Sequence, residues 1–339
     1  MKVVIAVDSF KGSLCSLEAG NAVAEGIKRV NENIETEVCP LADGGEGTVE
    51  ALTWGMGGEM QTITAVNPLG ENIKCQYGIV GKTAIIEIAS TAGLTLLTEQ
   101  KRNPLYTTTY GVGEMIKHAI QKGCRRFIVG IGGSATNDGG IGMLQALGYG
   151  MLDKYGKQVC YGAMGLKELE KITTENVLSE LKECTFYIAC DVNNPLCGEK
   201  GCSAVFAPQK GATKQMVKDM DKWLEKYAIL AKSVSKNADS SVAGTGAAGG
   251  LGFAFLAFTN AVLQSGIDIV LKEIDFESKI KTADIVVTGE GKLDKQTVMG
   301  KAPIGVATLA KKYHKPVIAF AGSVTSESRI CNQYGIDAY

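Results

Sequence analysis

Short runs of apolar, β-branched residues alternate along the chain with segments whose apolar positions recur at helical spacing. Residues 2–8 are typical of a buried parallel strand, and residues 16–30 of an amphipathic helix with Ser16 as its N-cap. A similar strand–helix–strand pattern occupies residues 283–291, 302–312 and 316–323. Both ends of the chain therefore predict parallel strands joined by crossover helices.

The middle of the chain has a different pattern. Residues 61–90 contain three alternating runs separated by turns at 68–70 and 81–82, which predicts a β-meander. Helices are expected before the meander at 46–54, and after it at 140–147, 213–233 and 251–263. The change of pattern indicates that the middle of the chain forms a domain of its own.

We therefore expect an α/β protein with two domains. A doubly wound domain is predicted from residues 1–60 and 283–339, and a mixed α/β domain from residues 61–282 is predicted to be inserted into it. Residues 335–339 resemble the start of a further strand. The doubly wound domain is accordingly expected to be truncated at its C-terminus.

Composition narrows the class of protein. The chain has 339 residues, of which 45% are hydrophobic, and 35 basic residues nearly balance 36 acidic ones. No basic stripe is present, so nucleic acid is not an expected partner. The uncharged segment 242–266 is rich in glycine, and its helical part is only as long as a core helix, so no membrane partner is expected either.

Cysteine usage and the N-terminus indicate a compartment. The ten cysteines are scattered without a CxxC pair, which favours free thiols over a metal site or a disulfide framework. The N-terminal segment becomes acidic too early for a signal peptide. We expect a cytoplasmic protein.

Glycine and acidic residues gather in five loops, each placed after an apolar strand. These loops are residues 8–12, 42–47, 132–140, 191–195 and 288–294. Ligands of open α/β sheets bind beyond the carboxyl ends of the strands, where glycine allows close approach and helix N-termini bind anions. Asp and Glu supply oxygen ligands for Mg²⁺, and Lys11 or Lys292 could contact phosphate. Taken singly, each loop is as typical of a helix cap.

Other chemistries have weaker support. Residues 244–249 match GxGxxG but lack a preceding buried strand, which leaves an NAD(P)-dependent oxidoreductase acting on a small hydroxy acid as the alternative. A sensor that binds a sugar acid or nucleotide without turnover is a third possibility. Both histidines, His118 and His314, lie outside the loops, so a histidine-based triad is not expected. Phosphoryl transfer depends least on histidine.

The loops together resemble the type I glycerate kinase family, bacterial enzymes that phosphorylate D-glycerate with ATP. The matching stretches run in family order and are DSFKGSL, PLADGGEGT, EIASTAGL, TTTYGVGE, GIGGSATNDGGIGMLQALG, ACDVNNPLCG, FAPQKGA, GTGAAGGLG and VVTGEGKLDKQTVMGKAP. The resemblance implies a flavodoxin-like domain from both chain ends and an inserted domain likened to a restriction-endonuclease fold. It also implies ATP and Mg²⁺, with phosphorylation usually at the 2-hydroxyl of glycerate. Family members continue past the position of Tyr339, which suggests a less stable terminal domain here.

Roles for individual residues follow as hypotheses. Asp191, Lys11 and Asp294 are the candidate catalytic residues, and Asp191 and Glu290 are the candidate metal ligands. Asp191 is favoured as the base because it ends a buried strand and precedes a rigid Asn-Asn-Pro turn. Candidate substrate- or nucleotide-binding residues are Ser9, Asp43, Gly44, Gly45, Ser134, Asn137, Asp138, Gly139, Asn193, Gly246 and Gly289. The expected partners are the small molecules ATP and D-glycerate, and a homodimer is possible.

Overall fold

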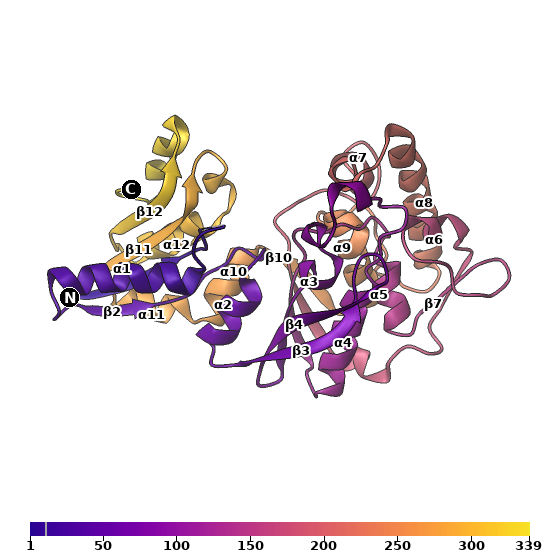
Figure 1. Ribbon diagram of the computed structural model, residues 1–339, viewed down its shortest axis with the longest axis horizontal. Coiled ribbons are helices and arrows are strands. Elements are labelled where there is room, and N and C mark those ends of the chain that lie inside the picture. The colour runs from indigo at the N-terminus through magenta and orange to yellow at the C-terminus, as the bar shows by residue number, and fades with distance from the viewer. Residues whose placement is uncertain (11) are drawn as a thin grey trace. The chain divides into compact units, whose positions relative to one another are not determined.

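The computed structural model describes residues 1–10 and 12–339, and the chain divides into two compact units (Figure 1). Unit 1 consists of Met1–Glu59 and Ser265–Tyr339, and unit 2 of Met60–Gln264. The second boundary lies before the one expected from the sequence, because helices α10 (Gly266–Glu273) and α11 (Phe276–Thr282) belong to unit 1. Both units mix helices and sheets, as the predicted α/β class requires.

Unit 1 is built on a parallel sheet of four strands in the order β12-β11-β1-β2. The strands are β1 (Lys2–Val7), β2 (Glu35–Val38), β11 (Ile285–Leu293) and β12 (Val317–Val324). Its other helices are α1 (Ser16–Val30), α2 (Thr48–Gly55) and α12 (Ala302–Lys312). At the C-terminus, Ala338 forms an isolated parallel bridge with Ile318, where the sequence suggested that a further strand begins.

The central strand β1 is buried on both faces. Val3, Ile5 and Val7 pack with Ala19 of α1, and Val4 and Ala6 on the opposite face are also fully buried. Helices α11 and α12 contact β1 as well. A strand covered in this way reads as a continuous apolar run, and that is why residues 2–7 were recognisable from the sequence.

The start of α1 differs from the expectation in one residue. The N-cap is Cys15, whose thiol accepts a hydrogen bond from the Glu18 N–H while the Glu18 carboxylate accepts the Cys15 N–H at 2.8 Å. Ser16 is the first helical residue, and its hydroxyl binds outside the helix, to the carbonyl of Val7 at 2.7 Å. The capping box therefore begins one residue earlier than Ser16.

Unit 2 contains a mixed sheet of six strands in the order β10-β9-β6-β5-β4-β3. The strands are β3 (Glu59–Val66), β4 (Asn72–Val80), β5 (Thr83–Glu87), β6 (Arg126–Gly130), β9 (Thr185–Ala189) and β10 (Ala261–Gln264), and β7 (Gly150–Leu152) pairs separately with β8 (Lys171–Thr173). Strands β5, β6, β9 and β10 are parallel, and β4 runs antiparallel to β5. The predicted meander corresponds to β3, β4 and β5.

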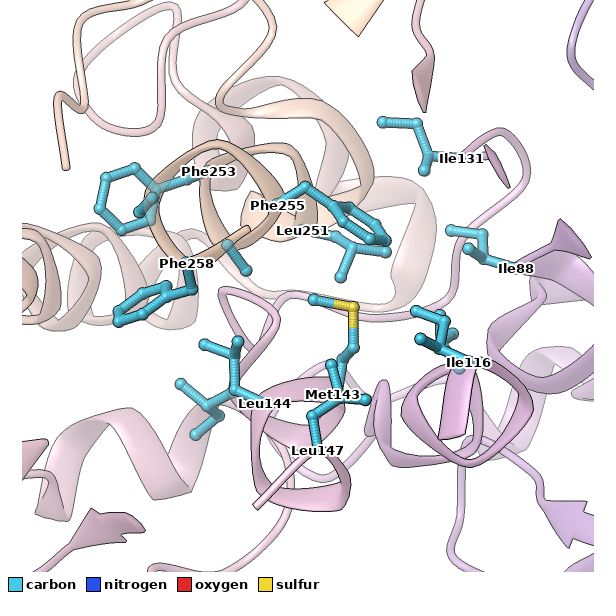
Figure 2. Packing of buried hydrophobic residues seen from close by; sticks show 14 of the residues in the cluster. Ile88, Ile116, Ile131, Met143, Leu144, Leu147, Leu251, Phe253, Phe255 and Phe258 are labelled. Carbon is cyan, nitrogen blue, oxygen red and sulfur yellow. The ribbon is translucent and has the colours of Figure 1, made fainter. Parts of the chain in front are cut away.

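The helices of unit 2 enclose a large apolar core. They are α3 (Ala89–Ala92), α4 (Tyr110–Gln121), α5 (Ile141–Ala146), α6 (Ala163–Glu168), α7 (Cys202–Phe206), α8 (Lys214–Lys232) and α9 (Ala247–Phe258). Leu251, Phe255 and Phe258 of α9 face Met143 and Leu144 of α5 in this core (Figure 2). No helix within residues 1–10 and 12–339 is both long and apolar enough to cross a membrane.

The helix predicted at residues 251–263 was placed too far along the chain. Helix α9 ends at Phe258, and the backbone of Thr259 is extended, with φ −136° and ψ 176°. The four residues Ala261–Gln264 form β10, which pairs in parallel with β9. An apolar run this short can form either a helix or a strand. Here it forms a strand because its backbone hydrogen-bonds to the edge of β9.

Candidate active site

In unit 1, the segments that follow β1 and β2 are fastened to each other by Ser16. Its hydroxyl donates to the carbonyl of Val7 and accepts the N–H of Leu41, both at 2.7 Å. The N–H of Asp8 donates to the carbonyl of Gly289 in β11 at 2.8 Å. The Asp8 carboxylate in turn accepts the N–H of Ser9 at 2.6 Å. These bonds hold the segments after β1 and β2 together and fasten the first of them to the interior of β11.

Ser9 lies at a small cavity in this arrangement. The cavity has a volume of about 30 Å³ and is lined by residues that include Ser9, Ser16 and Gly47. It is large enough for water but not for a nucleotide. Lys11, the predicted catalytic lysine two residues further on, lies outside the described residues.

The loop after β2 is shaped by glycine. The Asp43 carboxylate accepts the N–H of Gly45 at 3.1 Å, and Gly44 has φ +88°, which favours glycine. A side chain at Gly266 would overlap the carbonyl oxygen of Asp43. The backbone of the loop is therefore packed directly on the start of α10, and glycine at 266 is required for that close approach.

Glu290 and Gly289 lie inside β11 rather than in a loop, which corrects the placement of the predicted loop 288–294. The Glu290 carboxylate accepts the hydroxyl of Thr297 at 2.7 Å and forms an ion pair with Lys301 at 3.2 Å. Only 9% of the Glu290 side chain is exposed, whereas 34% of the Lys301 side chain is. The glutamate thus holds a partly exposed lysine in place.

Asp294 follows the end of β11 and is held by local partners. Its carboxylate accepts the N–H of Gln296 at 2.8 Å and lies 3.2 Å from the ammonium of Lys292. The backbone hydrogen bond from Gln296, assisted by Lys292, lowers the pKa of Asp294 below its usual range. A carboxylate with a lowered pKa is a weaker proton acceptor than an ordinary aspartate.

In unit 2, Asp138 caps the segment that leads into α5. Its buried carboxylate accepts the N–H and the hydroxyl of Thr109 at 2.9 and 2.8 Å, and the N–H of Gly140 at 3.0 Å. Burial raises the pKa of Asp138, and these hydrogen bonds oppose the rise. The side chain is fully occupied in holding the loop together, and a direct contact with a ligand does not fit this position.

Asn137 and Gly139 are also buried in the protein's own contacts. The Asn137 amide donates to the hydroxyl of Ser203 at 2.9 Å, while its carbonyl oxygen has no partner. The Gly139 N–H donates to the carbonyl of Gly249 at 2.9 Å. A Cβ at Gly139 would meet the ring of Tyr227 at 3.0 Å, so this glycine serves packing.

The Ser134 hydroxyl is bound by Lys210, which is not among the predicted site residues. The ammonium of Lys210 donates to the Ser134 hydroxyl at 2.8 Å and to the carbonyl of Thr136 at 2.6 Å. Burial lowers the pKa of Lys210 to about 8. The lysine belongs to the FAPQKGA stretch, but polar and glycine neighbours there give no sign that its side chain is buried.

Asp191 and Asn193, unlike the buried Lys210, lie at the surface. Strand β9 ends at Ala189, and both side chains are exposed on the segment that follows it. The next residue, Asn194, anchors this segment through a hydrogen bond from its amide to the carbonyl of Lys200 at 2.8 Å. The structure therefore places both side chains at the surface of an anchored segment.

The GxGxxG segment packs against the two loops just described. The Gly246 N–H donates to the carbonyl of Asn194 at 2.9 Å, and a side chain at Gly246 would overlap the carbonyl oxygen of Pro195. Ala248 and Gly249 have φ +51° and +66°, so the start of α9 is not a regular helix turn. The element before this segment is helix α8, so no strand leads directly into it. The context of a dinucleotide-binding motif is therefore missing, and the oxidoreductase alternative has no structural support.

The family model described as "Glycerate kinase family" matches residues 3–339. The chain belongs to the glycerate kinase family. Glycerate kinase from Bacillus subtilis (strain 168) is 47% identical over 340 residues, which cover 100% of this chain and 89% of that protein. Glycerate 2-kinase from Escherichia coli (strain K12) is 45% identical, with the same coverage of both chains.

A solved structure agrees with this family membership. The crystal structure assigned to a glycerate kinase 2 from Salmonella typhimurium LT2 superposes with a TM-score of 0.93 at 45% identity, and the match covers 100% of this chain and 89% of that one. A member of the glycerate kinase family is a phosphotransferase, so the chain is an enzyme of this class.

The predicted site residues of this glycerate kinase family member are divided between the two units. One set lies in unit 1 and comprises Gly289 and Glu290 inside β11 together with Ser9, Asp43, Gly44, Gly45 and Asp294 in segments that follow strands. The other lies in unit 2 and comprises Ser134, Asn137, Asp138, Gly139, Asp191, Asn193 and Gly246. Thr297, Lys301, Ser203 and Lys210 were missed, although all but Ser203 belong to stretches that resemble the family.

Proposed function

We propose that the chain transfers the γ-phosphoryl group of ATP to the 2-hydroxyl of D-glycerate in an Mg²⁺-dependent reaction and releases 2-phosphoglycerate and ADP. The family match over residues 3–339 carries this proposal. The similarity to a glycerate 2-kinase over 100% of this chain supports the choice of hydroxyl. The Gly- and Asp-bearing segments at the strand ends supply the chemical context that phosphoryl transfer requires.

Asp191 is the residue to which we assign proton transfer. As the glycerate oxygen bonds to phosphorus, its proton passes to a carboxylate, and the bond between phosphorus and the ADP oxygen breaks. Asp138 is buried and fully hydrogen-bonded, Glu290 is ion-paired with Lys301, and Asp294 has a lowered pKa. Asp191 lies exposed beyond the end of β9, and this exposure is the reason for preferring it to the buried Asp138 and Glu290.

Cationic side chains of unit 1 suit a polyphosphate. Lys301 and Lys292 keep 34% and 56% of their side chains exposed while each is paired with a carboxylate. A lysine held in this way presents a positioned point charge to phosphate oxygens. Lys11 stays a predicted phosphate contact, since it lies outside the described residues.

The residues fit Mg²⁺ in the manner usual for phosphotransferases. Among the residues that the structure describes, no three His, Cys, Asp or Glu side chains are grouped as a metal site. Mg²⁺ in such enzymes binds to one or two carboxylates, and phosphate oxygens and water complete its shell. Asp191 is the accessible candidate, whereas Glu290 reaches a metal only by giving up Lys301. When bound, Mg²⁺ neutralises charge on the phosphates.

A coupled assay tests the proposal. The protein is incubated with ATP, Mg²⁺ and D-glycerate, and the product is detected with enolase and pyruvate kinase. A signal without phosphoglycerate mutase identifies 2-phosphoglycerate. A signal that needs mutase identifies the 3-isomer and refutes the choice of hydroxyl. If no ADP forms, the kinase proposal itself fails.

We infer that unit 1 is doubly wound and flavodoxin-like, which its strand order and the two buried faces of β1 support. The likeness of unit 2 to a restriction-endonuclease fold, the cytoplasmic location and a homodimer stay predictions. Sedimentation of the purified protein tests the last of these.

A further inference from the structure

Lys210 is buried in a way that lysine seldom is. It ends a short 3₁₀ turn (Pro208–Lys210) between α7 and α8, and only 1% of it is exposed. Lysine is almost never fully buried unless it is paired. Among the described residues, Lys210 forms no ion pair, and its ammonium instead binds the hydroxyl of Ser134 and the carbonyl of Thr136. A buried charge of this kind needs an explanation beyond packing.

The two acceptors belong to the segment that follows β6. Strand β6 ends at Gly130, and its carboxyl end lies at the edge of the parallel strands where ligands bind in α/β sheets. The same segment is held from other sides, since the Ala135 N–H donates to the carbonyl of Ala92 and the Thr107 hydroxyl donates to the carbonyl of Ala135, both at 2.8 Å. Lys210 adds the connection to the turn before α8.

The hydrogen bond from Lys210 also determines the orientation of the Ser134 hydroxyl. An ammonium group has three donors and no acceptor, so the serine oxygen must accept from it. The proton of Ser134 cannot point back at the lysine and is left for another acceptor. Ser134 is 8% exposed, whereas Lys210 is 1% and Thr136 is 0% exposed, so Ser134 is the least buried member of this cluster and directly follows the exposed Gly133. A carboxylate or phosphate oxygen is the acceptor that such a donor suits.

We propose that Lys210 is a positioning residue which fixes the segment Ser134–Thr136 and orients the Ser134 hydroxyl as a donor to an anionic oxygen of the substrate. This inference rests on the proposed glycerate kinase activity and adds a residue to it. Lys210 itself does not touch substrate, because it is enclosed. Its effect passes through Ser134.

The protonation state of Lys210 gives the proposal a pH dependence. The titratable groups that face it are Cys202 of α7 and Asp138 of the segment before α5. Burial raises the pKa of Cys202 to about 12, so this thiol stays neutral while Lys210 titrates. With a pKa of about 8, Lys210 is charged below that pH and neutral above it. A neutral amine can accept the Ser134 proton, so orientation of the hydroxyl is lost as the pH rises.

The test compares wild type with Lys210→Met, Ser134→Ala, the double variant and the control Lys214→Met. Lys214 is an exposed lysine on the first turn of α8. We expect kcat/KM for D-glycerate to fall by about tenfold or more in each single variant, since one positioned donor is lost. The double variant is expected to be no slower than the worse single one, because both remove the same interaction. The control stays within twofold of wild type.

A pH profile and melting temperatures separate positioning from plain stability. Wild-type kcat/KM is expected to decline as the pH rises through about 8, and Lys210→Met is expected to lack this step. If folded Lys210→Met matches wild type within twofold, or keeps the same step, the proposal is overturned. Should Lys210→Met fail to fold, Ser134→Ala decides: unchanged kcat/KM overturns the proposal, and a tenfold loss with an unchanged melting temperature supports it.

Binding measurements keep this inference separate from the proposed function. Calorimetry with D-glycerate and with ATP is carried out on the same variants. If wild type binds D-glycerate without turnover, the kinase proposal fails, while weaker binding by both single variants still supports the positioning role. If wild type neither binds nor phosphorylates D-glycerate, both proposals are refuted.

Discussion

Single carboxylates in this enzyme are distinguished by their surroundings rather than by their place in a motif. Asp138 and Glu290 are buried and satisfied by partners of the protein itself, and Asp294 is stabilised as an anion by Gln296 and Lys292. Asp191 is exposed beyond β9. All four residues lie in loops predicted at strand ends, and the loop sequences do not show which of the four are buried. Burial is what separates Asp138 and Glu290 from the exposed Asp191.

Substitution of Asp191 by Asn tests its assignment as the base. The change removes the negative charge and the proton-accepting ability but keeps the shape of the side chain. We expect kcat to fall by about 10²-fold or more, in the range typical of general bases, with a melting temperature within about 1 °C of wild type. Steady-state kinetics and thermal unfolding measure the two quantities.

Asp219→Asn is the matched control for this prediction. Asp219 lies on α8 and accepts a hydrogen bond from the side chain of Gln215, which an Asn can also accept. This variant should keep normal turnover. Near-normal kcat in Asp191→Asn would remove Asp191 from the mechanism.

Lys210 and Ser16 mark the limit of prediction for single residues. Ser16 was expected to cap α1, but its hydroxyl instead joins the ends of β1 and β2. Lys210 was not singled out at all, since a lysine beside glutamine and glycine is normally solvated. In both residues the decisive partner lies far away along the chain, and no local pattern encodes it.

Among the elements, helices and buried strands were the easier part to predict. The predicted bounds 16–30 and 302–312 match α1 and α12, because an apolar stripe and clear ends define each helix. Strand β11 runs on to Leu293 through Gly289 and Gly291, although glycine is depleted in strands. Pairing with β12 from Val286 to Leu293 provides the stability that local propensity lacks.

The first turn of α9 requires glycine at position 249, both for its backbone conformation and because there is no room for a side chain. Gly249 has φ +66°, and a side chain there would overlap the carbonyl oxygen of Thr136. Replacement of Gly249 by Ala is expected to destabilise the protein by roughly 3 kcal/mol or more, because strain and overlap add. Denaturant unfolding of the purified variant measures this difference.

Gly123→Ala provides the comparison. Gly123 follows α4 with φ +91° and has no heavy atom within 4 Å of an added Cβ. Only conformational strain applies there, so a loss of about 1 kcal/mol is expected. Equal losses in the two variants would mean that the packing of α9 against residues 136–139 contributes nothing to stability.

For the molecule as a whole, the two units differ in how the chain builds them. Unit 2 is one continuous segment, and its apolar core includes Tyr77, Phe127, Phe186 and Phe255. Unit 1 needs both ends of the chain to complete its sheet. The sequence indicated this division through the change of pattern after residue 60, but α10 and α11 could not be assigned because helices look alike on either side of the boundary.

A fragment comprising residues 60–264 is therefore expected to fold alone. It contains a complete core and all six strands of its sheet apart from the first residue of β3. We expect a cooperative thermal transition and native-like near-ultraviolet circular dichroism, without glycerate phosphorylation. A fragment that shows no cooperative transition would mean that unit 2 depends on unit 1 for its stability.

The pairing of β1 with β11 has a consequence for biosynthesis. At about 5 to 20 residues per second, a ribosome needs roughly 15 to 55 seconds to make the roughly 280 residues between the two strands. During that interval β2 is available on one side of β1, but the side that β11 will occupy stays open. An unpaired apolar strand edge invites association with other chains. Nascent-chain protection by a chaperone is therefore most needed at the first strand to be synthesised.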